Sequence, residues 1–241
     1  MPACAILNSS LRSMPVALAR QIVRTGLPGI DAQEDAVCIL EWVAETLELR
    51  TRQGEALRAE WQRPVAAGIR QPFTRALAPA RNGMVIDATA GLGGDSLQLA
   101  LLAGKVISVE RHPVVFTLLA AAIQNAVGKG WPAAAKITPR FGDAVDIIAR
   151  LPAADVIFID PMFPPKRKSS ALPPKAVRIL RDLVGDDQDS DALFDAARTY
   201  AVRRVIVKRP LHAPPMAADA IAVHTGKVIR YEVYEPIGSP P

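Results

Sequence analysis

Residues that could act on a planar amine follow one another at Asp160, Pro161 and Phe163, directly after an apolar run. An exocyclic amine is a poor nucleophile because its lone pair is delocalised into the ring. A carboxylate and the backbone carbonyl of Pro161 could accept its two N–H groups, and the ring of Phe163 could stack on the base. We predict a reaction site at these three residues; an Asp-Pro turn and a core aromatic are the structural alternatives.

The segment Asp160-Pro161-Met162-Phe163 resembles the Asp/Asn-Pro-Pro-aromatic motif of methyltransferases that modify planar amino groups. That chemistry needs no covalent intermediate. Methylation of cytosine carbon 5, by contrast, needs a thiolate nucleophile, and no cysteine stands near this segment in the sequence. The motif therefore favours transfer to nitrogen.

A glycine-rich turn runs from Asp87 to Asp95 and contains Gly91, Gly93 and Gly94. Glycine lets the backbone approach a bound nucleoside. A nicotinamide dehydrogenase would carry GxGxxG, but Ser96 takes the third glycine position. Asp95 would also repel a pyrophosphate at the helix N-terminus. S-adenosylmethionine (SAM) carries a sulfonium and an ammonium group and no phosphate, so acids at Asp87 and Asp95 favour SAM.

Two further acids follow predicted strands. Glu110 is placed to accept hydrogen bonds from ribose hydroxyls, although a carboxylate paired with Arg111 is the structural alternative. Asp143 could accept from an adenine amino group, or cap a helix with Asp146 three residues on.

Alternating strands and helices surround these residues. Strands are predicted at 84–86, 105–109, 136–140, 155–159 and 204–207, with helices at 96–103, 114–125, 144–150 and 192–200. Two further strands within 221–234 form a hairpin around Thr225-Gly226-Lys227. This order predicts an α/β fold with a mostly parallel, seven-stranded sheet covered on both faces and an antiparallel C-terminal hairpin. Ligands bind such sheets at the carboxyl ends of the strands, where Asp87, Glu110, Asp143, Asp160 and Lys208 fall.

The first eighty residues show weaker periodicity. A strand at 4–7, a helix at 16–24 and a hairpin within 45–61 indicate a small α+β lobe, and 71–83 reads as its connection. We therefore expect an N-terminal lobe and connection over 1–80 and a main domain over 81–241.

The net charge is +5, which favours a polyanionic partner. Two basic clusters follow the predicted ends of the fourth and fifth strands, at Lys166, Arg167 and Lys168 and at Lys208 and Arg209. At the pocket mouth they could bind phosphates of an RNA. On charge alone they would be a solvated face.

Cys4 and Cys38 read as isolated reduced thiols of a cytoplasmic protein, because they lack CxxC spacing. The three histidines are scattered, so we expect no metal site. We also expect no membrane span and no secretory signal.

Several blocks together resemble the RsmJ family, the bacterial methyltransferases of guanine N2 in small-subunit (16S) ribosomal RNA. The blocks are Asp87–Asp95, Glu110–Val115, Asp160–Pro164 and Val207–Pro210 with Ala213–Pro215. The resemblance implies a class I (Rossmann-like) methyltransferase fold, SAM as donor and the small subunit or its RNA as substrate. It places cofactor contacts at Gly94, Asp95, Glu110, Arg111, Asp143, Ala144 and Asp160. This chain departs from the family at Gly94, where arginine is frequent, and at Asp143, where serine is frequent.

Four alternatives remain open at this point. Adenine N6 and a protein glutamine also present planar amino groups. A nicotinamide-dependent oxidoreductase would use the same glycine turn, and a non-catalytic ribosome-assembly factor would use only the basic clusters.

Overall fold

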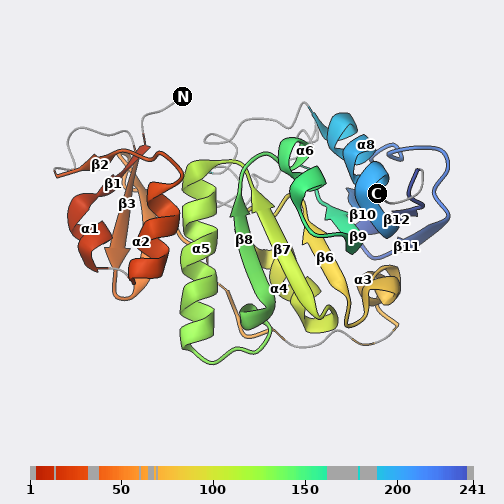
Figure 1. The fold of residues 1–241 in the computed structure, drawn as a ribbon, viewed down its shortest axis with the longest axis horizontal. Coiled ribbons are helices and arrows are strands. Elements are labelled where there is room, and N and C mark those ends of the chain that lie inside the picture. Colours follow the sequence, from red (N-terminus) through yellow and green to blue (C-terminus); the bar gives the residue numbers. More distant parts are fainter. Residues whose placement is uncertain are drawn as a thin grey trace.

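Two β-sheets organise the chain, and a long helix lies between them (Figure 1). The computed structural model describes residues 4–13, 15–31, 38–59, 61–64, 68, 70–161, 179 and 189–237. The larger sheet has seven strands in the order β11-β12-β10-β9-β6-β7-β8. These strands are β6 (Met84–Asp87), β7 (Lys105–Glu110), β8 (Ile137–Phe141), β9 (Ala154–Ile159), β10 (Ala201–Pro210), β11 (Ala222–Thr225) and β12 (Ile229–Tyr234).

Strands β6 to β10 are parallel to one another, and β12 and β11 add an antiparallel edge. The predicted class I architecture is therefore confirmed. Successive apolar residues of each central strand point to opposite faces, so Val85 and Ile86 enter different cores. Both faces are covered, which is why these strands are apolar throughout.

Helices cover the two faces in separate sets. The core with Val85 also contains residues of α3 (Pro72–Ala76), α4 (Gly94–Leu102) and α5 (Pro113–Gly128). The core with Ile86 contains residues of α6 (Ala144–Ile147) and α8 (Ser190–Tyr200). The helices predicted from periodicity are thus present, each beginning within two residues of its expected start.

The smaller sheet has the order β2-β1-β3-β4-β5 and carries α1 (Asn8–Ser13) and α2 (Val16–Val23). Its strands are β1 (Cys4–Leu7), β2 (Gly29–Ile30), β3 (Cys38–Val43), β4 (Thr46–Thr51) and β5 (Ala56–Leu57). The predicted strand, helix and hairpin are confirmed. Strand β3 was not predicted from the sequence. It pairs with both β1 and β4 and is the central strand of this sheet.

Helix α5 joins the two sheets into one body. Leu119 and Ile123 of α5 pack in the core of the larger sheet, whereas Leu118 and Ala121 pack with Leu47 and Leu49 of β4. This explains why eleven of the sixteen residues of α5 are buried and why its sequence shows so little amphipathic contrast.

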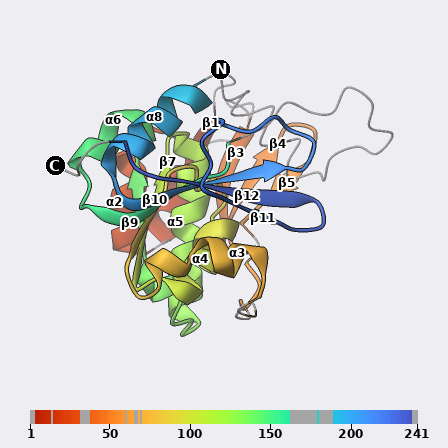
Figure 2. The same cartoon turned by 90° about the vertical axis from the view of Figure 1, so that its right-hand side faces the viewer.

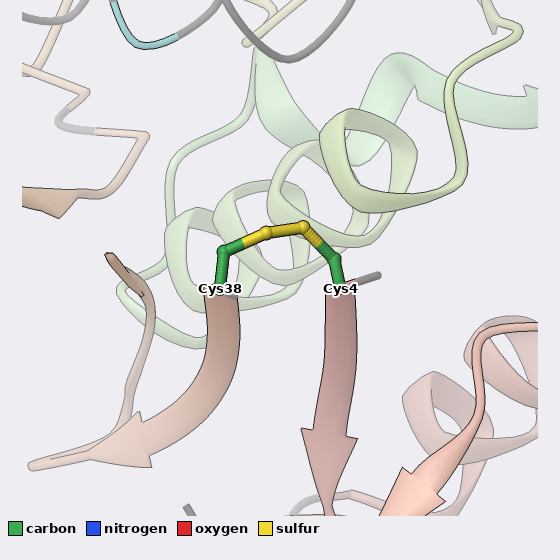
Figure 3. Close-up of a disulfide and its surroundings, with 2 residues drawn as sticks. All are labelled: Cys4 and Cys38. Carbon is green, nitrogen blue, oxygen red and sulfur yellow. A yellow bond between two sulfur atoms is a disulfide. The ribbon is translucent and has the colours of Figure 1, made fainter. Parts of the chain in front are cut away.

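Cys4 and Cys38 are joined by a disulfide between β1 and β3 (Figure 3). The prediction of two reduced thiols is therefore wrong. The two cysteines are register partners on neighbouring parallel strands, with Cα atoms 4.7 Å apart, although 34 residues separate them in sequence. Only the strand pairing brings them together.

The connection predicted at 71–83 is not irregular. It contains α3, which begins at Pro72, and a 3-10 turn at Ala78–Ala80. Proline suits the first position of a helix because its fixed φ is helical and its missing N–H has no partner to lose there. None of the described helices has the length and apolar character required to span a bilayer.

Candidate functional site

A cavity opens at the carboxyl ends of β6, β7, β8 and β9. Seven residues predicted for the site line it: Gly91, Glu110, Arg111, Asp143, Ala144, Asp160 and Pro161. Eight further lining residues were not predicted for the site: Ala88, Thr89, Val109, Val115, Gly142, Asp189, Ser190 and Leu193. The switch point of the sheet thus brings together Glu110, Asp143 and Asp160, acids that lie up to 50 residues apart in sequence.

The turn after β6 needs its glycines for two different reasons. Gly91 lines the cavity with φ +54°, and Gly93 has φ +82°, both in the left-handed region. A Cβ at Gly93 would lie 2.4 Å from Leu119 Cδ1 and 2.5 Å from Trp61 Cζ2. Gly91 thus leaves room beside the cavity, whereas Gly93 is required by close packing beneath the turn.

Glu110 ties this turn to the end of β7. Its Oε2 accepts a hydrogen bond from the Gly91 backbone N–H at 2.9 Å, and its Oε1 accepts from the His112 N–H at 2.7 Å. These two hydrogen bonds hold the carboxylate at the cavity wall.

Asp143 is the N-cap of α6, because its Oδ1 accepts from the Val145 N–H at 3.0 Å. Its Oδ2 lies 3.3 Å from Arg111 Nη1, and the same nitrogen lies 2.5 Å from Asp189 Oδ2. The capping role is confirmed. Arg111 therefore gathers two acids from distant segments on one side of the cavity.

Asp87 is buried beneath the turn, with 1% of its surface exposed. Its Oδ2 accepts from Ser96 Oγ at 2.5 Å, and Ser108 Oγ donates to Ser96 Oγ at 2.8 Å. Burial raises the pKa of Asp87 to about 7, although the Ser96 hydrogen bond opposes this shift. Its side chain holds the start of α4 against β6 and β7, so a direct cofactor contact at Asp87 remains a prediction.

Lys208 joins Asp95 and Asp160. Its Nζ lies 2.6 Å from Asp95 Oδ2 and 2.9 Å from Asp160 Oδ2. Burial raises the pKa of Asp160 to about 6; Lys208 opposes this shift, and Asp95 adds to it. The two carboxylates raise the pKa of Lys208 despite its burial. The backbone N–H of Asp160 also donates to Thr89 Oγ1 at 2.7 Å, which fixes the reaction loop to the glycine turn.

The predicted basic rim is wrong at Lys208 and Arg209. The ammonium of Lys208 is occupied by two carboxylates, and Arg209 is only 6% exposed, with Nη1 3.1 Å from Met216 Sδ. Alternation along β10 turns Arg209 into the opposite face. Phe163, Lys166, Arg167 and Lys168 lie outside the described residues.

The cavity suits a cationic nucleoside. Its described lining contains four carboxylates, from Glu110, Asp143, Asp160 and Asp189, and one guanidinium, from Arg111. A dinucleotide pyrophosphate would meet this acidic excess unfavourably, whereas SAM brings a sulfonium and an ammonium group. In the part of the chain that the structure describes, no three His, Cys, Asp or Glu side chains gather as a metal site.

Three residues that were not predicted for the site support it through hydrogen bonds. Thr89 anchors Asp160, Ser96 holds Asp87, and Trp61 donates its indole N–H to the Leu92 carbonyl at 2.8 Å. Thr89 lies within the glycine turn and Ser96 directly follows it. Because both hydroxyls are close in sequence to the predicted acids, a supporting hydrogen bond could have been predicted for them. Trp61 comes from the preceding segment, and its sequence environment gave no such signal.

Known proteins are similar to this chain in sequence and structure over most of its length. A family model of SAM-dependent methyltransferases matches residues 26–236. Ribosomal RNA small subunit methyltransferase J of Serratia proteamaculans is 34% identical over 230 residues, which cover 86% of this chain and 90% of that protein. The protein of the same name from Laribacter hongkongensis is 35% identical over a match that covers 92% of this chain and 84% of that protein.

The crystal structure of a SAM-dependent methyltransferase from Neisseria gonorrhoeae superposes with a TM-score of 0.75 at 26% identity. The match covers 98% of this chain and 97% of the other, so it includes the N-terminal sheet as well as the larger one. On the family model, the relatives and this fold together, the chain belongs to the ribosomal RNA small subunit methyltransferase J family of SAM-dependent methyltransferases.

Proposed function

We propose that this chain transfers a methyl group from SAM to the exocyclic N2 amino group of a guanine in small-subunit ribosomal RNA. The observation that carries this proposal is the placement of Asp160. It follows β9 directly, lines the cavity beside Pro161, and has its carboxylate held by Lys208 and its backbone held by Thr89. The relatives' names supply the RNA class, and the amine chemistry comes from these residues.

SAM supplies an electrophilic methyl group on its sulfonium. We assign the ribose hydroxyls to Glu110 and the adenine end to the Asp143–Ala144 turn beside Arg111. Gly91, Gly94 and Asp95 are assigned to the methionine end, where Asp95 would meet the ammonium group. Asp95 supports this orientation, because the sulfonium and the α-ammonium group of the methionine end are positive, and a carboxylate there attracts the ammonium group rather than the α-carboxylate.

Asp160 would accept one N–H of the target amine while the Pro161 carbonyl accepts the other. Both acceptors orient the nitrogen lone pair and favour the positive charge that forms on nitrogen as the methyl arrives. With a pKa of about 6, Asp160 is mainly ionised at pH 7 and above. Phe163, three residues on, is proposed to stack on the base.

The first test is methyl transfer from radiolabelled SAM to small ribosomal subunits that lack their native modification, followed by RNA digestion and nucleoside identification. Label in N2-methylguanosine is the expected result. Asp160→Asn should lower kcat about a hundredfold or more, because it removes a preorganised anionic acceptor. Its matched control is Asp146→Asn, an exposed acid of α6, which should keep full activity.

Each other outcome names a different function. Label in N6-methyladenosine or in a protein glutamine would move the proposal to that substrate. Absence of label together with thermal stabilisation by a dinucleotide would favour an oxidoreductase. Activity in cells that survives Asp160→Asn would favour an assembly factor. Since the proposed substrate is the ribosome, we place the activity in the cytoplasm.

A further inference from the structure

Helices α3 and α4 and the β11–β12 hairpin lie close together (Figure 2). Residues of α3, of the start of α4 and of this hairpin line a second hollow beside the reaction site. It has a volume of about 300 Å³, and Gln71, Phe73, Asp95, Gln98 and Tyr231 contribute to its walls. We call it the α3 groove. None of the residues described along the cofactor cavity is shared with it.

Lys208 stands between the α3 groove and the cofactor cavity. Its Nζ contacts Asp95, which lines the groove, and Asp160, which lines the cavity. Tyr231 is the direct register partner of Lys208 across β10 and β12, so both side chains stand on the same face of the sheet. The groove therefore adjoins the acceptor carboxylate through Lys208 and Asp95.

The walls of the α3 groove offer stacking and hydrogen-bonding groups together. The rings of Phe73 and Tyr231 have centroids 5.5 Å apart and are tilted by 58°. Gln71 and Gln98 each bring an amide with both donors and acceptors. Burial raises the pKa of Tyr231 to about 12, so its hydroxyl remains a donor at neutral pH. Aromatic faces with amides alongside are how proteins hold unpaired RNA bases.

Two exposed cations stand near the α3 groove. Lys227 follows Gly226 of the groove wall, and Arg75, in the last turn of α3, lines the neighbouring hollow with His224. Among the described residues, neither has an ion-pair partner. Exposed cations without a partner are available to phosphates, unlike Lys208 and Arg209.

We propose that the α3 groove binds an unpaired nucleotide of the RNA substrate next to the nucleotide that is methylated. The half-buried ring of Phe73 stacks on its base, Gln71, Gln98 and the Tyr231 hydroxyl read its edge, and Arg75 and Lys227 meet the flanking phosphates. This inference rests on the proposed function, since it assumes that the substrate is RNA.

The test compares Gln98→Ala and the double variant Arg75→Ala/Lys227→Ala with the wild-type chain on unmodified small subunits. We expect both to raise KM for the subunit at least fivefold, with kcat and the Kd for SAM within twofold of wild type. The double variant should also change the salt dependence of binding. The slope of the logarithm of the subunit association constant against the logarithm of salt concentration should fall in magnitude by about one to two. Its matched control is Arg150→Ala/Lys105→Ala, which removes exposed cations far from the groove and should change neither quantity.

Photocrosslinking locates the base independently. Subunits whose RNA contains 4-thiouridine should crosslink to peptides that contain residues 70–75 or 226–231. If both groove variants methylated the subunit at the wild-type rate and with the wild-type KM, the nucleotide subsite would be overturned and the proposed function would stand. RNA crosslinks confined to peptides outside residues 70–75 and 226–231, with methylation intact, would also overturn it. Absence of methylation by the wild-type chain would instead reject the proposed function itself.

Discussion

The ammonium of Lys208 sets the charge of the reaction site. It contacts two carboxylates at 2.6 Å and 2.9 Å, so the group of three charges carries one net negative charge when Asp95 and Asp160 are ionised. Burial raises the pKa of Asp160, Lys208 opposes this shift, and the neighbouring Asp95 adds to it. The pKa of Asp160 therefore depends on Lys208, although Lys208 need not touch a substrate.

Methyl transfer should depend on the ionisation of Asp160. Its carboxylate is the working form, so kcat should be level above about pH 7 and fall as the pH drops through 6, approaching tenfold per unit. In Lys208→Met the stabilising cation is lost, the pKa of Asp160 rises, and the half-maximal point should move to higher pH. Rates on unmodified subunits between pH 5 and 9 measure this.

Lys105→Met is the control for this prediction, because Lys105 is exposed at the opposite end of the sheet. It should reproduce the wild-type profile. If the profiles of wild type and Lys208→Met had the same half-maximal pH, Lys208 would not control the ionisation of Asp160.

At the scale of elements, the β6–α4 turn is the part on which the site is built. It supplies Gly91 to the cavity, Thr89 to Asp160 and Asp95 to Lys208. Its shape depends on a left-handed residue at Gly93, against which Trp61 and Leu119 pack directly. Neighbouring Gly94 begins α4 and has open space around its Cβ position.

Gly93→Ala and Gly94→Ala should therefore behave differently. Gly93→Ala forces a Cβ into close contacts at positive φ, and we expect a loss of about 1–3 kcal/mol in the free energy of unfolding. Gly94→Ala should be neutral or slightly stabilising, because alanine is favoured over glycine in a helix. Urea unfolding of the two variants measures the difference. Equal stabilities would show that the packing beneath the turn yields without cost.

At the scale of the whole molecule, the N-terminal sheet is connected to the cofactor loop. Helix α5 packs against both sheets, and Asn125 Nδ2 of α5 donates to the Glu45 carbonyl at 3.0 Å. Trp61, which follows the small sheet, donates to the Leu92 carbonyl within the glycine turn. We propose that residues 1–80 form a lobe that supports the shape of the cofactor site and that 81–241 form the methyltransferase domain.

Trp61→Phe should weaken SAM binding through this connection. It keeps an aromatic ring in the packing but loses the indole hydrogen bond, a net contribution of about 1 kcal/mol or roughly fivefold in Kd. Isothermal titration with SAM measures the change. Trp131→Phe, a half-buried tryptophan at the far end of α5, is the matched control and should leave the Kd unchanged. An unchanged Kd in Trp61→Phe would mean that the lobe does not influence the cofactor loop.

The sequence by itself determined the larger sheet and most of the residues along its cavity. Apolar runs ending in Asp87, Glu110 and Asp160 predicted strands whose carboxyl ends meet, because parallel strands place those ends at one edge. Local signals were sufficient there, since each strand and helix is specified by its own periodicity and its own glycine or proline.

The tertiary structure decided which charges remain free and which side chains meet. Lys208 and Arg209 are adjacent in sequence, yet alternation along β10 buries Arg209 beside Met216, whereas Lys208 is half-buried and pairs with Asp95 of α4. Cys4 pairs with Cys38 and Trp61 reaches Leu92 only because strands and segments far apart in sequence pack together. Such pairings depend on register and packing across the fold, and no local pattern encodes them.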